Sequence, residues 1–285
     1  MRTVVTARFP GLVLLGLLTA CTASPAGPAP PSAAPAVPSS PRAVTLPPPG
    51  AVADYQLGGA YPPAADVRVV VRDRTAAPGP GLYSVCYVNA FQTQPDETGT
   101  WLQEHPDLLL RVEGSLVQDP GWPGEFLLDT STPTARAGLA QVVGAWIDGC
   151  ADAGFAAVEA DNLDSATRSD DALTMDDAYA YSALLSARAH ARGLAYAQKN
   201  TPQTSSEQAR TAGFDFAVAE SCQLFAECDE YTAVHGDHVV EVEYADDGRE
   251  PFEAACAARG GTVSVLYRDR ELLPRGVPGY EFDHC

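Results

Sequence analysis

The chain has 285 residues, of which 46% are hydrophobic and 19% charged, a balance typical of a globular protein and not of a disordered or fibrous one. Lys and Arg total 18 against 37 Asp and Glu, which gives a net charge of −19. This balance argues against a nucleic-acid partner and against a basic membrane-binding patch, because both need clustered Lys and Arg. It permits a neutral or cationic ligand, although solubility alone explains an acidic surface equally well.

Residues 1–20 have the features of an export signal. Arg2 and Arg8 precede an apolar run over residues 9–18 that is too short to span a bilayer. The run ends in a Leu-Thr-Ala-Cys sequence that resembles a bacterial lipobox, which implies cleavage before Cys21, lipid on its sulfur and anchoring of the mature chain to the cell membrane outside the cytoplasm. An ordinary signal peptide, with a secreted product, is the alternative. Loss of the two arginines would take the net charge from −19 to −21.

A proline-rich segment follows the export signal. Residues 22–50 contain ten prolines among Ala, Ser and Gly, a composition that cannot bury a core and favours extended polyproline II. We therefore expect residues 21–50 to form a tether. Residues 51–285 remain for the folded domain, a length that fits a single α/β barrel, and we expect a monomer whose only membrane contact is the lipid.

The folded part holds six cysteines, an even number that suggests disulfides in an exported protein. Fifteen pairings of six cysteines are possible. Cys222 and Cys228 are close in sequence and are expected to clip a loop. For the others we favour the pairs Cys86–Cys150 and Cys256–Cys285.

Eight short apolar or β-branched runs recur along the chain, and each leads to a polar residue. They span residues 67–71, 82–88, 126–128, 155–158, 194–197, 214–219, 239–242 and 262–266. Helical patterns lie between several of them, over 134–151, from Thr174 to Gly193, from Thr204 to Gly213, and over 250–259. Alternation of strand and helix predicts a parallel sheet, and eight strands in this length predict a (β/α)8 TIM-type barrel. A doubly wound open sheet is the rival, but no Gly-rich first turn for a phosphate follows Asp73.

Acidic residues gather at the carboxyl ends of the predicted strands, which is where barrel enzymes place their active sites. They are Glu159 with Asp161, Glu220, and Glu241 with Glu243. Carboxylates crowded on one rim repel each other, so some of their pKa values must rise. One ionised and one protonated carboxyl are what glycosidic cleavage requires. Each single residue also has a structural explanation, such as a cap, a turn or an ion pair.

Metal binding is the competing interpretation of the acidic residues. The segment Asp161-Asn162-Leu163-Asp164 lacks the Gly and the closing Glu of a calcium loop. The chain has no Cys-x-x-Cys pair, and its five histidines are scattered without metal spacing. We expect neither a metal ion nor a cofactor.

Several short motifs occur in an order that is typical of one enzyme family. They are Tyr55-Gln56-Leu57, Cys86-Tyr87, Trp122-Pro123-Gly124-Glu125, the stretch from Val158 to Asp164, Lys199-Asn200, Glu220-Ser221-Cys222 with Cys228 and Tyr231, and Val242-Glu243-Tyr244. The stretch Glu159-Ala160-Asp161-Asn162-Leu163-Asp164 resembles the Glu-Pro-Asp-Asn-Val-Asp segment of glycoside hydrolase family 114, the endo-α-1,4-polygalactosaminidases. The resemblance covers roughly residues 55–267. Ala160 stands where the family usually has Pro, and Phe126-Leu127 where Arg-Trp is common.

The resemblance implies a barrel glycosidase that cleaves α-1,4-linked galactosamine-containing polysaccharide, which is cationic when deacetylated. Asp161 would be the nucleophile and Glu220 the general acid/base, on the fourth and sixth predicted strands. Sugar subsites would be lined by Asp73, Tyr87, Asp129, Asn162, Asp164, Lys199, Glu243 and Tyr244. Tyr87 and Trp122 are candidates to stack on a sugar, with core packing as the alternative for both. Lys199 is expected to pair with Glu159 or Asp161 and to lower the pKa of its partner.

Two other functions are compatible with the sequence. The first is a surface lipoprotein that binds polysaccharide without cleaving it, against which the presence of both Asp161 and Glu220 argues. The second is a barrel hydrolase that acts on another α-glycan or depends on a metal.

Overall fold

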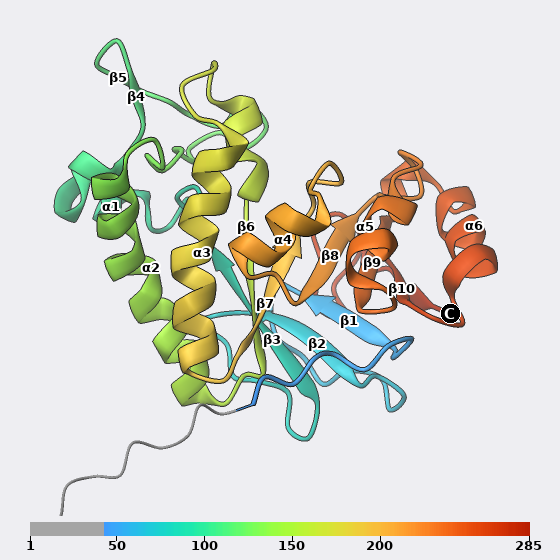
Figure 1. The fold of residues 1–285 in the computed structure, drawn as a ribbon. Helices are drawn as coiled ribbons and strands as arrows, with labels where there is room; N and C mark the ends of the chain where they lie inside the picture. Colours follow the sequence, from blue (N-terminus) through green and yellow to red (C-terminus); the bar gives the residue numbers. More distant parts are fainter. Residues whose placement is uncertain (1–42) are drawn as a thin grey trace, which may run out of the picture. The chain divides into compact units, whose positions relative to one another are not determined.

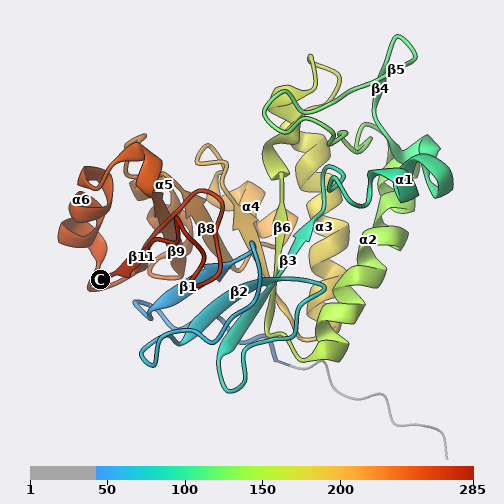
Figure 2. The ribbon, with the colours of Figure 1, turned by 180° about the vertical axis from the view of Figure 1, so that it is seen from behind.

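The computed structural model describes residues 43–285. The predicted signal peptide, Cys21 and most of the tether lie outside the described residues, so their assignments stay predictions. Eight parallel strands pair in chain order and curve into a nearly closed barrel, which confirms the predicted fold class (Figures 1 and 2). They are β1 (Ala53–Gln56), β2 (Val69–Asp73), β3 (Tyr83–Asn89), β6 (Ala157–Asp161), β7 (Ala195–Lys199), β8 (Phe216–Glu220), β9 (Val239–Tyr244) and β10 (Ser264–Arg268). A ninth strand, β11 (Phe282–His284), pairs antiparallel with β10.

Two strand assignments made from the sequence were wrong. The run 126–128 forms only isolated bridges with residues 92, 109 and 118, and β3 pairs directly with β6. The first barrel strand, β1, was missed because its polar residues Asp54 and Gln56 interrupt the apolar pattern. Both are buried and hydrogen-bonded to arginines, Asp54 to Arg268 (3.1 Å) and Gln56 to Arg72 (3.0 Å).

Helices cover the outer side of the strands from β3 onward (Figure 1). They are α2 (Pro133–Ala153), α3 (Met175–Ala191), α4 (Ser206–Ala212), α5 (Cys228–His235) and α6 (Glu250–Arg259). The predicted capping box at Thr174 is present, whereas α4 begins one residue later than expected, with Ser205 and Gln208 forming its capping box. The connections β1–β2 and β2–β3 contain no helix among the described residues, so the outer ring of helices is incomplete.

The long connection between β3 and α2 forms a lobe at the carboxyl ends of the strands. It contains α1 (Thr98–Glu104), the 3-10 turn Pro106–Leu108 and a small hairpin of β4 (Arg111–Val112) and β5 (Ser115–Leu116). The run 126–128 packs within this lobe, which explains its apolar character. The lobe brings Trp122 and Glu125 to the rim of the barrel.

Two apolar layers stabilise the barrel. Alternate residues of the strands, such as Val71, Val85 and Phe216, fill its interior, while residues of opposite orientation pack under α2 and α3. The ends of the sheet are joined by a side chain: Arg268 of β10 is buried and donates to Asp54 and to the carbonyl of Tyr55 on β1. This charged contact takes the place of a last hydrogen-bonded strand pair.

Disulfides join the three favoured cysteine pairs, Cys86–Cys150, Cys222–Cys228 and Cys256–Cys285. Three disulfides indicate maturation in an oxidising compartment outside the cytoplasm. Residues 43–50, assigned to the tether from composition, already contact the barrel: the carbonyl of Thr45 accepts a hydrogen bond from Tyr83 and that of Pro47 bonds His238. Within residues 43–285, no helix has both the length and the apolar character needed to cross a membrane.

Candidate active site

Three consecutive strands end in a charged residue that is followed by a turn with positive φ. Asp161 ends β6, Lys199 ends β7 and Glu220 ends β8. The residues that follow them, Asn162, Asn200 and Ser221, have φ of 66°, 51° and 53°. Left-handed backbone suits Asn better than most residues, and it turns the chain sharply away from each strand. The three charged side chains therefore meet at the carboxyl end of the barrel.

Lys199 is the centre of this cluster. Its ammonium lies 3.0 Å from Glu159, 3.0 Å from Asp161 and 3.2 Å from Glu220. Burial acts to lower the pKa of Lys199, but the carboxylates of Asp161 and Glu220 outweigh it and raise the pKa well above its usual value. Lys199 is therefore a permanent cation that draws the acidic groups together.

Asp161 is held as a carboxylate. Burial alone would raise its pKa, but the charge of Lys199 and hydrogen bonds from Tyr87 and Asn162 bring the pKa below its ordinary value. The hydroxyl of Tyr87 donates to Oδ2 (2.7 Å) and the backbone amide of Asn162 donates to Oδ1 (2.8 Å). Its side chain keeps 18% of its surface exposed, so an ionised, oriented carboxylate faces the cavity.

Glu220 is oriented from both sides. The amide of Asn200 donates to Oε2 (3.1 Å), and its oxygen accepts the backbone N–H of Glu220 (2.9 Å). The hydroxyl of Tyr244 donates to Oε1. The Glu220 side chain is 27% exposed, whereas that of Lys199 is 2% exposed, so the carboxyls and not the amine are the groups a ligand can reach.

A second carboxyl lies beneath Asp161. Glu159 is fully buried and accepts hydrogen bonds from Tyr55 and Lys199 (3.0 Å). Burial raises the pKa of Glu159 to about 7, despite the opposing charge of Lys199. Glu159 is thus a support for Lys199 and is not accessible to a ligand.

These groups face a cavity of about 520 Å³. Of the residues proposed from the sequence, it is lined by Tyr87, Trp122, Asp161, Asn162, Asp164, Lys199, Glu220 and Tyr244. Trp122 is 57% exposed at the rim, which leaves a large apolar face free for a ligand and argues against core packing. Six carboxylates and three basic side chains contribute to the lining, so the cavity is acidic.

Several groups in the cavity wall carry no signal in the sequence that marks them as functional. Arg168 joins Asp119 (2.6 Å), Asp164 (2.8 Å) and the side-chain oxygen of Asn162 (3.0 Å), and so links the lobe to the turn after β6. Asp119 and Arg168 are distant in sequence and belong to no strand-end pattern, which is why they escaped notice. Asn200 could have been found, because Asn directly after a charged strand end is a signal for a left-handed turn.

Asp73 and Asp129, both predicted for sugar subsites, lie outside the cavity. Asp73 ends β2 but accepts hydrogen bonds from the backbone and hydroxyl of Thr75 (2.8 and 2.5 Å). Asp129 makes the same pattern with Ser131 (2.9 and 2.5 Å). Both act in the structure as turn-forming residues, and a part in sugar binding stays a prediction.

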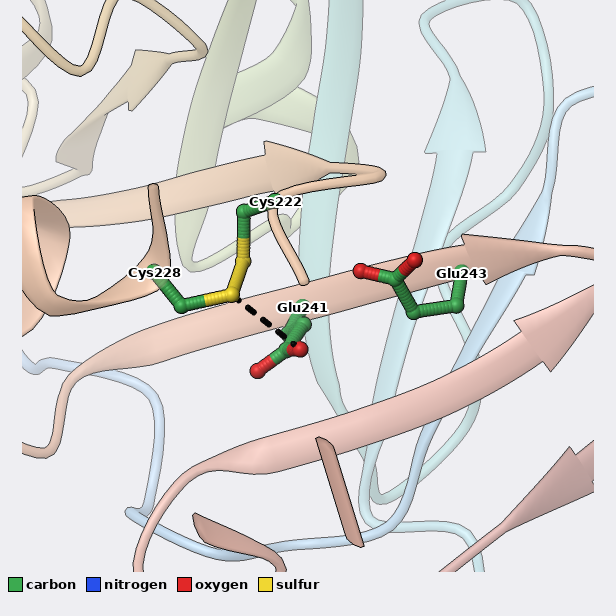
Figure 3. Close-up of side chains that lie close together, drawn as sticks. All are labelled: Cys222, Cys228, Glu241 and Glu243. Carbon is green, nitrogen blue, oxygen red and sulfur yellow. Dashed lines mark hydrogen bonds between the residues drawn. A yellow bond between two sulfur atoms is a disulfide. The ribbon is translucent and has the colours of Figure 1, made fainter. Parts of the chain in front are cut away.

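Glu243, also predicted for a subsite, points to the outer side of β9. It and Glu241 are turned toward the Cys222–Cys228 disulfide, with one atom of each residue within 4.8 Å of the others (Figure 3). Two cysteines and two carboxylates at this spacing suggest a metal site, but the sulfurs are bonded to each other and offer no thiolate. Glu243 is instead in contact with the loop that follows Glu220.

A parallel barrel with oriented carboxylates at the carboxyl ends of its strands has the architecture of a barrel enzyme. The model of glycoside hydrolase family GH114 matches residues 33–285, and the chain belongs to this family. It is accordingly a glycoside hydrolase, a class of enzymes that act on polysaccharides.

Solved structures support the fold. A structure of Aspergillus fumigatus Ega3 in complex with galactosamine aligns with a TM-score of 0.65 and 21% identity, covering 85% of this chain and 98% of that one. The glycoside hydrolase domain of Pseudomonas aeruginosa PelA aligns with a TM-score of 0.53 and 15% identity, covering 79% and 97%. Among curated protein sequences, none is significantly similar to this chain.

Proposed function

We propose that this protein cleaves α-1,4-linked galactosamine-containing polysaccharide within the chain, with Asp161 as the nucleophile and Glu220 as the general acid/base. The observation that carries the proposal is the pair of accessible carboxyls held by one buried ammonium at the carboxyl end of a GH114 barrel. The galactosamine bound in the Ega3 structure supports the choice of sugar.

The spacing of the two carboxyls favours retention of anomeric configuration. Oδ1 of Asp161 and Oε2 of Glu220 lie 3.0 and 3.2 Å from the same nitrogen, so they cannot be further apart than the sum of these distances. That sum, which limits the distance between these two oxygens, is below the roughly 6.5 Å at which the range for inverting enzymes begins.

The reaction then proceeds in two steps. Asp161 attacks the anomeric carbon while Glu220 donates its proton to the leaving oxygen, which breaks the glycosidic bond and forms a glycosyl ester on Asp161. Glu220, now a carboxylate, takes a proton from water, and that water releases the sugar from Asp161. Lys199 stabilises the Glu220 carboxylate between the steps, because its charge lies beside that oxygen throughout.

The acidic cavity supports a cationic substrate. Its lining holds six carboxylates against three basic side chains, and this excess of negative charge would attract the free amines of a deacetylated polymer. The exposed ring of Trp122 offers a face for a sugar, and Asn162 and Tyr244 offer polar groups for its hydroxyls.

Product release from a deacetylated α-1,4-galactosamine polymer tests the function. We expect the wild type to release oligosaccharides, and Asp161→Asn and Glu220→Gln to lose at least about 10³-fold in kcat/KM. Binding without release would favour a polysaccharide-binding lipoprotein. Cleavage of other α-glycans in preference would redefine the substrate, and loss of activity in EDTA would favour a metal-dependent hydrolase.

We also propose that the mature chain is a monomer anchored by lipid on Cys21. The lipobox-like sequence and the proline-rich segment support the lipid anchor. Expression of Cys21→Ser should move the protein from the membrane fraction to the soluble fraction, and an unchanged distribution would contradict the anchor.

A further inference from the structure

Glu243 is a buried carboxyl without a cationic partner. Its residue is 0% exposed, and its Oε1 accepts the backbone N–H of Gln223 (2.9 Å). Its Oε2 has no hydrogen-bond partner among residues 43–285. Arg259, the basic residue in this region, donates instead to the carboxylate of Glu241 (3.0 and 3.1 Å). Burying a carboxyl is unfavourable unless it is hydrogen-bonded, so the contact of Glu243 with the Gln223 N–H is the interaction that offsets its burial.

The partners of Glu243 belong to the loop 221–227, which we call the Glu220 loop because it continues directly from Glu220. Ser221 leaves the strand in a left-handed turn and donates to the carbonyl of Val242 (2.7 Å). At the tip of the loop, Leu224 and Phe225 are 41% and 63% exposed. Apolar packing therefore does not hold the tip. The Cys222–Cys228 disulfide closes the base of the loop, Arg259 donates to the side-chain oxygen of Gln223 (2.7 Å), and Glu243 binds the backbone N–H of Gln223 between these two contacts.

Strand β9 contacts both the Glu220 side chain and the Glu220 loop. Neighbouring residues of a strand face opposite sides of the sheet. Tyr244 points inward and donates to Oε1 of Glu220, while Glu243 points outward and accepts from the backbone N–H of Gln223. The turn at Ser221 is thus fixed on one side by Glu220 itself and on the other by the anchored loop.

We propose that Glu243 is a positioning residue, which fixes the orientation of the general acid/base Glu220 by anchoring the Glu220 loop. This inference rests on the role proposed above for Glu220. Glu243 touches no substrate in this arrangement and acts only through the backbone of residues 221–224.

Glu243 can act as an anchor in its neutral form. Burial raises its pKa to about 7, and the nearby carboxyls of Glu241 and Asp247 contribute to the same rise. The carbonyl oxygen of the protonated acid accepts hydrogen bonds from N–H groups as the carboxylate does. An amide of the same shape should therefore replace it, whereas an apolar side chain should not.

Leaving-group dependence of Glu243→Leu and Glu243→Gln tests the proposal. A substrate with a poor leaving group needs the general acid, while an activated dinitrophenyl glycoside of a galactosamine oligosaccharide does not. We expect Glu243→Leu to lose about 10- to 100-fold in kcat/KM on the polymer but only about 2-fold on the activated glycoside, because a displaced Glu220 protonates the leaving oxygen poorly. Glu243→Gln should stay within about 3-fold of wild type on both, because it keeps the acceptor.

The control variant is Asp215→Asn, at the opposite end of β8, where Asp215 binds His190 and the backbone of Tyr196 (2.7 and 2.9 Å). It should lower thermal stability without changing the ratio of the two activities. Equal losses of Glu243→Leu on both substrates, or a Gln variant as impaired as the Leu variant, would overturn the proposal. If Glu243→Leu does not fold, Glu243→Asp, whose carboxyl is one methylene short of the loop, takes its place with the same expectation.

Amide hydrogen exchange separates failure of this inference from failure of the proposed function. The N–H of Gln223 should be protected in wild type and Glu243→Gln and lose at least about 10-fold of its protection in Glu243→Leu. A wild type that cleaves neither substrate but shows this pattern would reject the function and leave only the anchor. An active wild type with unaltered protection in Glu243→Leu would reject the inference alone.

Discussion

At the scale of single residues, the charge state of the site depends on Lys199. Three carboxyls share its ammonium, and each of them would be a buried or half-buried charge without it. The cation keeps Asp161 ionised against the effect of burial. A buried cation that neither attacks the sugar nor transfers a proton can thus set the charge state of the neighbouring carboxyls.

Replacement of Lys199 by Met should remove this support. We expect kcat/KM to fall by about 10²-fold or more, a loss typical of removing a charged group that stabilises the reaction centre. The pKa of Asp161 lies below its ordinary value in the wild type and would rise without the cation, so the acidic limb of the pH profile should move to higher pH. A pH series of initial rates measures both effects. Arg210→Met, on the exposed surface of α4, is the control, and an unmoved acidic limb would contradict the explanation.

Glu243 should make stability depend on pH with the opposite sign to a salt-bridged carboxylate. Its pKa is raised to about 7 from an ordinary 4.5, so the folded state binds more protons than the unfolded state between these values. Stability is therefore retained below about pH 4.5 and decreases by roughly 3 kcal/mol as the pH rises through 7. Glu243→Gln, which cannot ionise, should gain stability relative to wild type over this window in thermal or denaturant unfolding. Glu230→Gln, on the exposed face of α5, controls for the loss of one charge, and parallel pH curves for wild type and Glu243→Gln would refute the assignment.

At the scale of elements, the site is built by the turns that end β6, β7 and β8. Asn200 shows how one residue serves backbone and chemistry together: it adopts φ of 51° and binds Glu220 through both atoms of its amide. The turn requires a residue that adopts left-handed backbone, whereas Glu220 requires the side-chain amide. Substitutions at position 200 can therefore remove the amide while keeping or straining the turn.

Asn200→Gly should keep the turn and lose the side chain. We expect its stability to stay within about 1 kcal/mol of wild type, while kcat falls roughly 10-fold because Glu220 loses a partner on each side. Asn200→Ala loses the amide and also strains the backbone, which should lower the free energy of unfolding by about 1 kcal/mol more. Unfolding curves and kcat for the two variants give the comparison. If Ala and Gly variants were equally stable, the turn would not need the left-handed residue.

Sequence patterns predicted the elements that pack and missed those that are held by polar contacts. The predicted helix over 250–259 and the predicted end of α4 at Gly213 are confirmed, because helical periodicity and a terminating glycine are signals within the segment itself. The sequence pattern did not predict β1, because its polar residues are buried against arginines from β2 and β10. These contacts join residues distant in sequence and leave no local pattern. Residues 126–128 have the apolar pattern of a barrel strand but pack in the core of the lobe, and the two environments produce the same pattern in sequence.

The site itself was predictable to the extent that it lies at strand ends. Asp161, Lys199 and Glu220 each follow an apolar run and meet in space as the barrel requires. Glu243 also ends such a run, but a strand has two faces, and the sequence did not show that this residue faces outward. Arg168 and Asp119 come from irregular segments whose meeting depends on the tertiary fold alone.

At the scale of the whole molecule, an acidic protein carries an acidic cavity at the carboxyl end of its barrel. The net charge is −19, and carboxylates outnumber basic side chains around the cavity. A cationic polymer would be attracted before it makes any specific contact. A neutral, fully acetylated polymer would gain nothing from this field, so the two substrates should respond differently to salt.

Salt should therefore distinguish electrostatic attraction from recognition of the sugar. The screening length shortens from roughly 10 Å at 0.1 M salt to roughly 3 Å at 1 M, which removes long-range attraction but leaves contacts within the cavity. For a deacetylated α-1,4-galactosamine polymer we expect kcat/KM to fall by about 10-fold over this range with kcat nearly constant, because only encounter is weakened. Any activity on the acetylated polymer should change by less than about 2-fold. Glu271→Gln, at the rim of the cavity, should reduce the salt effect on the first polymer without altering kcat. Equal salt dependence for both polymers would mean that the acidic surface serves solubility, and that selection of the substrate lies wholly in contacts such as those of Trp122 and Asn162.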